Sequence, residues 1–241
     1  MAVDFSLLAL ISNAILPVVT FIVWLKIHSA VHSLNLPPAK KTKTSARAFL
    51  VLFGWLGLSL FLASLDAYHV SSEIISAGVP LGFILPILIG WHYMNKSATL
   101  QNIIDRIPGQ WIIFLQTYRI IGIVFLLLLA QNLLPALFAI PTGFGDVLIG
   151  ITAPIVGFFY IKKKPWSRML ARIWNYIGIL DLGVAIGLGI LLVLPPPFSL
   201  ISTSPTTEIM TLYPMVLVPV YAVPLSILMH LASLRKLGKE K

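Results

Sequence analysis

Long apolar segments run through the whole chain, and they constrain its fold more than any other feature. Seven can be marked between polar stretches, at residues 5–31, 48–68, 74–95, 111–131, 143–161, 171–194 and 212–234. A helix needs about 20 apolar residues to cross the hydrocarbon core of a bilayer. The runs do not alternate polar and apolar residues, as the strands of membrane barrels do. The sequence therefore predicts an all-α integral membrane protein, with a single domain over residues 1–241 made of seven transmembrane helices.

Composition supports this class and excludes several chemistries. Only 10% of the residues are charged, against about 25% in soluble domains. The chain has no cysteine, which excludes disulfides, thiolate catalysis and cysteine-ligated metals. Asp4 stands where a signal peptide would carry basic residues, so no cleaved leader is expected. The connections are too short for another domain, and function is expected within the bundle or at its surfaces.

The basic residues predict the orientation of the helices. All Lys and Arg except Arg119 lie in or near the connections after the first, third and fifth segments, or after the seventh, whereas Asp4, Asp66, Glu73 and Glu208 lie on the other side. By the positive-inside rule, the N-terminus is outside and the C-terminus is cytoplasmic. Residues 98–111 predict a short amphipathic helix on the cytoplasmic surface before the fourth span. The basic side is expected to attract anionic lipid headgroups, and no nucleic-acid-binding motif accompanies it.

Two opposite charges lie inside the predicted spans. Arg119 is about 12 Å of helical rise from the cytoplasmic side, and Asp181 is about 10 Å from the same side. A lone charge at the bilayer centre costs at least about 2.5–3.5 kcal/mol, so each is expected to be the other's partner. Small and polar residues at helical spacing accompany both (Gln116, Arg119 and Gly122; Asn175, Gly178, Asp181, Ala185 and Gly189). The pair is either a structural clasp or part of a ligand site.

Asp146 heads a third stripe of small residues, with Gly150, Ala153 and Gly157. It follows the turn-like sequence "PTGFG", so the expected role is an N-terminal helix cap near the outer surface. Tyr118, Asn175 and His230 are expected to line a pocket around Arg119 and Asp181. Asp146, His92 and Gln116 are secondary candidates for this site.

The histidines do not predict a metal site. His28 and His32 are one helical turn apart, but no HExxH motif or repeated histidine box accompanies them. Ser226 lies one turn before His230, yet the chain has no GxSxG elbow that would indicate a nucleophile. No metal and no cofactor are expected.

The stretches "YRIIGIVFLLLLAQNLLPALFAIPTGFGDVLIGITAPI" and "WNYIGILDLGVAIGLGIL" resemble a bacterial family of small polytopic membrane proteins with no assigned activity. The resemblance covers the second half of the chain. It implies the bacterial inner membrane as the setting and implies no mechanism.

The leading hypothesis is a pocket in the cytoplasmic half of the bundle, with Arg119 and Asp181 as its floor. Its ligand would be a lipophilic or amphiphilic molecule, such as a lipid or isoprenoid. Asp181 is the best candidate for a catalytic acid if the protein modifies that ligand, because a carboxyl in apolar surroundings can donate a proton. The alternatives are a small transporter coupled to protons through Asp181 or Asp146, and a non-catalytic membrane scaffold.

Overall fold

A computed structural model describes residues 5–70, 76–194 and 201–239, with side chains described from residue 14 onward. This part of the chain is helical and has no strand. The long helices are α1 (Phe5–Ser33), α2 (Pro38–Ser64), α3 (Gly78–Lys96), α7 (Ala136–Ile161) and α8 (Ser167–Val193). The segment between α4 (Ala98–Arg106) and α7 runs without a break through α5 (Gly109–Phe114), η1 (Leu115–Gly122) and α6 (Ile123–Ala130). The chain ends in η2 (Glu208–Thr211), η3 (Val218–Ala222) and α9 (Val223–Lys239).

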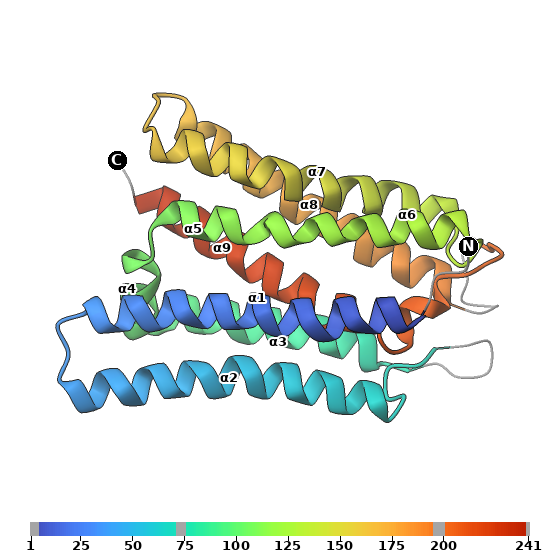
Figure 1. Cartoon of the computed structure of the whole chain (residues 1–241), viewed down its shortest axis with the longest axis horizontal. Helices are drawn as coiled ribbons and strands as arrows, with labels where there is room; N and C mark the ends of the chain where they lie inside the picture. Colours follow the sequence, from blue (N-terminus) through green and yellow to red (C-terminus); the bar gives the residue numbers. More distant parts are fainter. Residues whose placement is uncertain (1–4, 71–75, 195–200, 240–241) are drawn as a thin grey trace.

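Six segments in the described residues are long and apolar enough to cross a membrane: Ala14–Ser33, Pro38–Ser64, Gly109–Ala130, Ala136–Ile161, Ser167–Val193 and Val218–Lys239. The protein is therefore a multi-pass membrane protein. Helix α3, the third predicted span, has 19 residues but is not one of the six. It nevertheless lies along the same bundle (Figure 1) and packs against α9.

The long helices lie side by side, and their connections collect at the two ends of the bundle (Figure 1). The α1–α2 connection, α4 (Ala98–Arg106), the α7–α8 connection and the end of α9 lie together. We call this the basic end, because Lys40, Lys96, Lys162 and Lys236 lie at or near it. The start of α1 and the α6–α7 connection lie at the opposite end. The grouping of basic residues expected from the sequence is thus a feature of the structure.

Helix α4 is the short amphipathic helix that the sequence predicted before the fourth span. The Ser97 side chain caps it by accepting a hydrogen bond from the Leu100 amide at 3.3 Å. Ile103 and Ile104 are buried, and α4 contacts α1, α3 and α9. It therefore packs across the basic end of the bundle.

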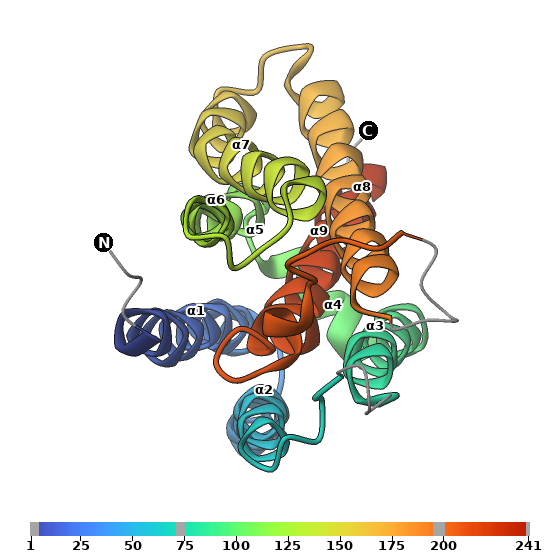
Figure 2. The same ribbon diagram turned by 90° about the vertical axis from the view of Figure 1, so that its right-hand side faces the viewer.

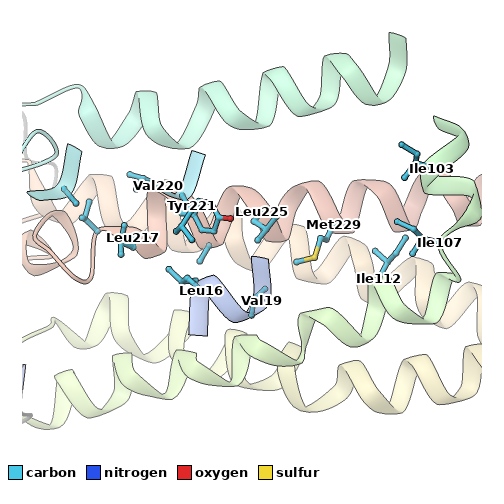
Figure 3. Close-up of a cluster of buried hydrophobic side chains, with 14 of the residues drawn as sticks. Leu16, Val19, Ile103, Ile107, Ile112, Leu217, Val220, Tyr221, Leu225 and Met229 are labelled. Atoms are coloured by element: carbon cyan, nitrogen blue, oxygen red, sulfur yellow. The ribbon is translucent and has the colours of Figure 1, made fainter. Parts of the chain in front are cut away.

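The last helix forms the centre of the molecule. Figure 2 shows α9 in the middle of the bundle, with α3, α5 and α8 around it. In the apolar stretch of the segment Val218–Lys239, which joins η3 and α9, 67% of the residues are buried, against 17% in that of α2. Figure 3 shows the cluster that results, in which Tyr221, Leu225 and Met229 face Leu16 and Val19 of α1 and Ile112 of α5. Helices α2 and α8 bury few of their residues and expose large apolar side chains, as expected for surfaces that face lipid.

Proline determines several helix boundaries that the sequence analysis misplaced. Helix α2 begins at Pro38, ten residues before the predicted start, and α7 begins directly after Pro135 instead of at residue 143. Proline suits the first turn of a helix, where its missing amide has no intrahelical partner. The predicted seventh helix is not α-helical throughout, because Val218–Ala222 forms a π turn around Pro219.

Small residues allow α7 to approach the α5–η1 segment closely. A Cβ added at Gly150 would lie 2.5 Å from the backbone nitrogen of Ile120, and one at Gly157 would overlap the Phe114 ring. Ala153, between them, is fully buried. The stripe that begins at Asp146 is therefore a helix-packing surface of the kind that small residues form in membranes.

We expect Gly150→Leu to destabilise the protein by about 1–3 kcal/mol or more, because a larger side chain there must push α7 away from the η1 backbone. The measurement is the thermal unfolding midpoint in detergent. Gly183→Leu on α8 is the matched control, because a Cβ at Gly183 has nothing within 4 Å. Equal midpoints for the two variants would contradict this packing.

Candidate functional site

Arg119 occupies the interior of the bundle. Arg119 lies near the middle of the Gly109–Ala130 segment, and only 3% of its surface is exposed. It belongs to η1, which has the 3₁₀ geometry with three residues per turn. Residues three apart therefore eclipse one another, and Gln116, Arg119 and Gly122 are all buried on one line. The three residues expected to share one face of the helix are therefore in line, and they face α7 and α9.

Arg119 pairs with two carboxylates. Its Nε donates to Oδ1 of Asp146 at 2.6 Å, and its Nη2 donates to Oδ2 of Asp181. The side chains of both aspartates are 14% exposed. The predicted contact between Arg119 and Asp181 is confirmed. The predicted cap at Asp146 is wrong, because α7 begins ten residues earlier and places Asp146 inside the helix, beside Arg119.

Histidine 230 completes the surroundings of the guanidinium. Arg119 Nη1 lies 3.3 Å from both the Gly178 carbonyl and Nε2 of His230. A guanidinium only donates hydrogen bonds, so Nε2 accepts and the ring proton is on Nδ1. Nδ1 donates to Oδ1 of Asn175 at 2.9 Å, while the Asn175 amide nitrogen donates to the Ala171 carbonyl and to Ser233. This network holds His230 in its neutral form.

Glycines on neighbouring helices make room for three polar side chains of this cluster. Gly122 of η1 lies against Asp146 of α7, Gly145 of α7 against Asp181 of α8, and Gly178 of α8 against His230 of α9. A Cβ at any of the three would overlap the facing side chain. The charged cluster thus depends on close contact between consecutive helices, which lets short aspartate side chains reach Arg119.

Tyr118 and Gln116 form a second polar group beside the charges. The Tyr118 hydroxyl is 2.5 Å from Oγ of Ser226 and 2.9 Å from the Ala222 carbonyl. Ser226 donates to Oε1 of Gln116, whose amide nitrogen donates to the Ser226 carbonyl. Ser226 therefore contacts Gln116 and Tyr118, and this arrangement does not make it a nucleophile paired with His230.

Two cavities meet at the charged cluster. The first, of about 70 Å³, is bordered by Tyr118, Arg119, Asp146 and Ser226, and otherwise by apolar residues such as Leu16, Phe125 and Met215. The second, of about 90 Å³, is bordered by Asp146, Ala185, Gly189, Thr207 and apolar residues of α3 and α8. Asp146 and Leu182 belong to both linings.

These cavities lie on the other side of Arg119 from the pocket that the sequence predicted. Their walls include Leu16 in the first half of α1, and Val70 after α2 and Leu194 after α8, which lie toward the opposite end of the bundle. Asn175 and His230 are fully buried and border neither cavity. Asp181, expected in the floor of the pocket, also borders neither, whereas Arg119 and Tyr118 border the first. Depth along each helix follows from position in the sequence, whereas the side of Arg119 on which the helices separate depends on how they pack.

The other histidines considered in the sequence lie apart from the charged cluster. His92 is exposed on α3, and its ring packs edge-on against Tyr93. The His28 and His32 rings are 4.3 Å apart, and Nδ1 of His28 is 2.7 Å from Oγ of Ser45. No group of three or more potential metal ligands occurs in the ranges that the structure describes.

We expect Arg119→Gln to be the most destabilising change in the cluster, because it leaves Asp146 and Asp181 together without a cation. Removing one partner of a buried ion pair typically costs about 3–5 kcal/mol. Asp146→Asn and Asp181→Asn should each cost less, because Arg119 keeps the other carboxylate, and their combination should cost more than the sum of the two. Thermal unfolding of these variants in detergent, with Asp105→Asn at the basic end as the control, measures the coupling. Strictly additive effects would rule out a shared cluster.

Comparison with known proteins identifies the family. A family model described as Domain of unknown function (DUF8737) matches residues 74–238. The match includes Arg119, Asp146, Asp181 and His230, whereas α1 and α2 precede it. No curated protein and no solved structure shows significant similarity to the chain. Because the matched residues make up most of the chain, the protein belongs to the family of this domain.

Proposed function

We propose that the chain crosses the bacterial inner membrane seven times, with its N-terminus outside and its C-terminus in the cytoplasm. Helix α3 supplies the seventh crossing, because it runs alongside the other long helices and packs against α9. An odd number of crossings agrees with the start of α1 and the end of α9 lying at opposite ends of the bundle (Figure 1). The positive-inside rule supports this orientation, and anionic lipid headgroups are the expected partners of the basic end.

A reporter that is active only in the cytoplasm should be active when fused after Lys241 and inactive when inserted after Ser202, between α8 and η2. The insertion site lies at the opposite end of the bundle from the basic end. Activity at both positions would show that the chain does not cross the membrane between Ser202 and Lys241. Activity at Ser202 alone would show that the orientation is the reverse of the one proposed.

We infer that the protein binds an amphiphilic small molecule, such as a lipid or isoprenoid, within the bundle. One observation carries this proposal: two cavities with mainly apolar walls meet at the charged cluster. Apolar cavities with a few convergent polar groups are typical of small-molecule sites. An apolar body would fill the space between α3, α8 and η3, and a polar head would lie at Asp146, close to Tyr118 and Ser226.

The contacts of the carboxylates favour binding over catalysis. Asp146 and Asp181 both accept hydrogen bonds from Arg119. A carboxylate that is engaged in this way acts as an anchor, whereas a general acid requires a proton that it can release to the substrate. The cluster therefore suits the recognition of a polar head better than proton donation to it.

Filling the second cavity should displace the ligand. We expect Gly189→Leu to reduce the amount of co-purifying amphiphile several-fold, because Gly189 borders that cavity and a Cβ there meets only Phe138, at 3.6 Å. Native mass spectrometry after extraction in a mild detergent measures this amount. Gly187→Leu is the matched control, since it makes the same change on the same helix where a Cβ has nothing within 4 Å. Equal occupancy in both variants, or none in the wild type, would contradict binding in this cavity.

A further inference from the structure

The charged cluster is unbalanced. Arg119 contributes one positive charge from η1, and Asp146 of α7 and Asp181 of α8 contribute two carboxylates. His230 of α9 is neutral, because its Nε2 accepts from Arg119 and its Nδ1 donates to Asn175. Tyr118 adds an uncharged hydroxyl. With both carboxylates ionised, the centre of the bundle carries one excess negative charge.

No other lysine or arginine in the described ranges borders either cavity. The other lysines and arginines of the described ranges lie toward the basic end. The cavity walls include residues near the opposite end, such as Val70 and Leu194. An uncompensated charge in apolar surroundings is unfavourable. A ligand in the cavities can therefore interact with the excess negative charge. Asp146 is the carboxylate that would contact it, because Asp146 borders both cavities.

We propose that the ligand of these cavities is a lipophilic cation, with an apolar body and a protonated amine that pairs with Asp146. The inference rests on the proposed function, since it specifies the head group of the amphiphile bound there. A cationic head would neutralise the cluster. An anionic head would add to the excess negative charge, and a neutral alcohol would leave that charge unchanged.

The test compares three probes with the same alkyl chain: decylamine, decanol and decanoate. Their binding at pH 7 is measured on the full chain in nanodiscs of zwitterionic lipid, with binding to empty nanodiscs subtracted. A close charge pair adds affinity that a neutral hydroxyl lacks, and a tenfold difference in affinity corresponds to about 1.4 kcal/mol. We therefore expect decylamine to bind at least about tenfold more tightly than decanol, and decanoate to bind more weakly than either.

Asp146→Asn should remove the preference for the amine, so that decylamine and decanol bind with similar affinity, because the variant removes the excess charge that the amine would neutralise. Asp105→Asn is the control, because this carboxylate pairs with Lys239 at the basic end, far from the cavities. The comparison of probes on the wild-type protein needs no variant, so a folding defect in Asp146→Asn does not affect it.

The outcomes separate this inference from the proposed function. If decanol and decylamine bind equally and Gly189→Leu weakens both, the cavities hold an amphiphile and the cationic head is wrong; a proton then neutralises the cluster. If decanoate binds most tightly, the cluster does not carry the excess negative charge that the inference requires. If no probe binds above the level of empty nanodiscs, the proposed function itself fails.

Discussion

The contact between one buried arginine and two aspartates determines much of this structure. Arg119 can be buried only where its donors meet acceptors, and these come from α7, α8 and α9. Aspartate side chains are short, so α7 and α8 must lie close to their neighbours. Gly122, Gly145 and Gly178 make this approach sterically feasible. The charges and the glycines therefore form one arrangement, in which a change to either disturbs the other.

The space next to this arrangement follows from the irregular backbone before α9. Pro214, Pro219 and Pro224 interrupt regular hydrogen bonding, and the chain forms a π turn at Val218–Ala222. Val218 and Val223 border both cavities. Toward the basic end α9 is regular and packs closely, with His230 and Ser233 buried. The cavities thus lie on the side where the last helix departs from regular geometry. The hydrogen bonds that join His230, Asn175 and Ser233 lie on the other side, toward the basic end.

Two parts of the structure show how far the sequence could be interpreted. The apolar runs predicted the long helices, and Asp181 was matched to Arg119 because both lie at similar depth. Asp146 was placed near the outer surface because the helix start was assigned to the turn-like sequence at residues 141–145. Those residues are helical, and α7 begins after Pro135. The error concerned where a helix begins, and it concealed the second carboxylate of the cluster.

By itself, the sequence determined the membrane class, the grouping of basic residues at one end and the pairing of charges by depth. These properties follow from hydropathy and from position along each helix, which are both one-dimensional. The tertiary structure decided which helices adjoin, that one arginine serves two aspartates, and on which side of Arg119 the cavities lie. Such features depend on how each helix is rotated about its axis and how closely its neighbours approach. Packing between segments that are distant in the sequence sets both.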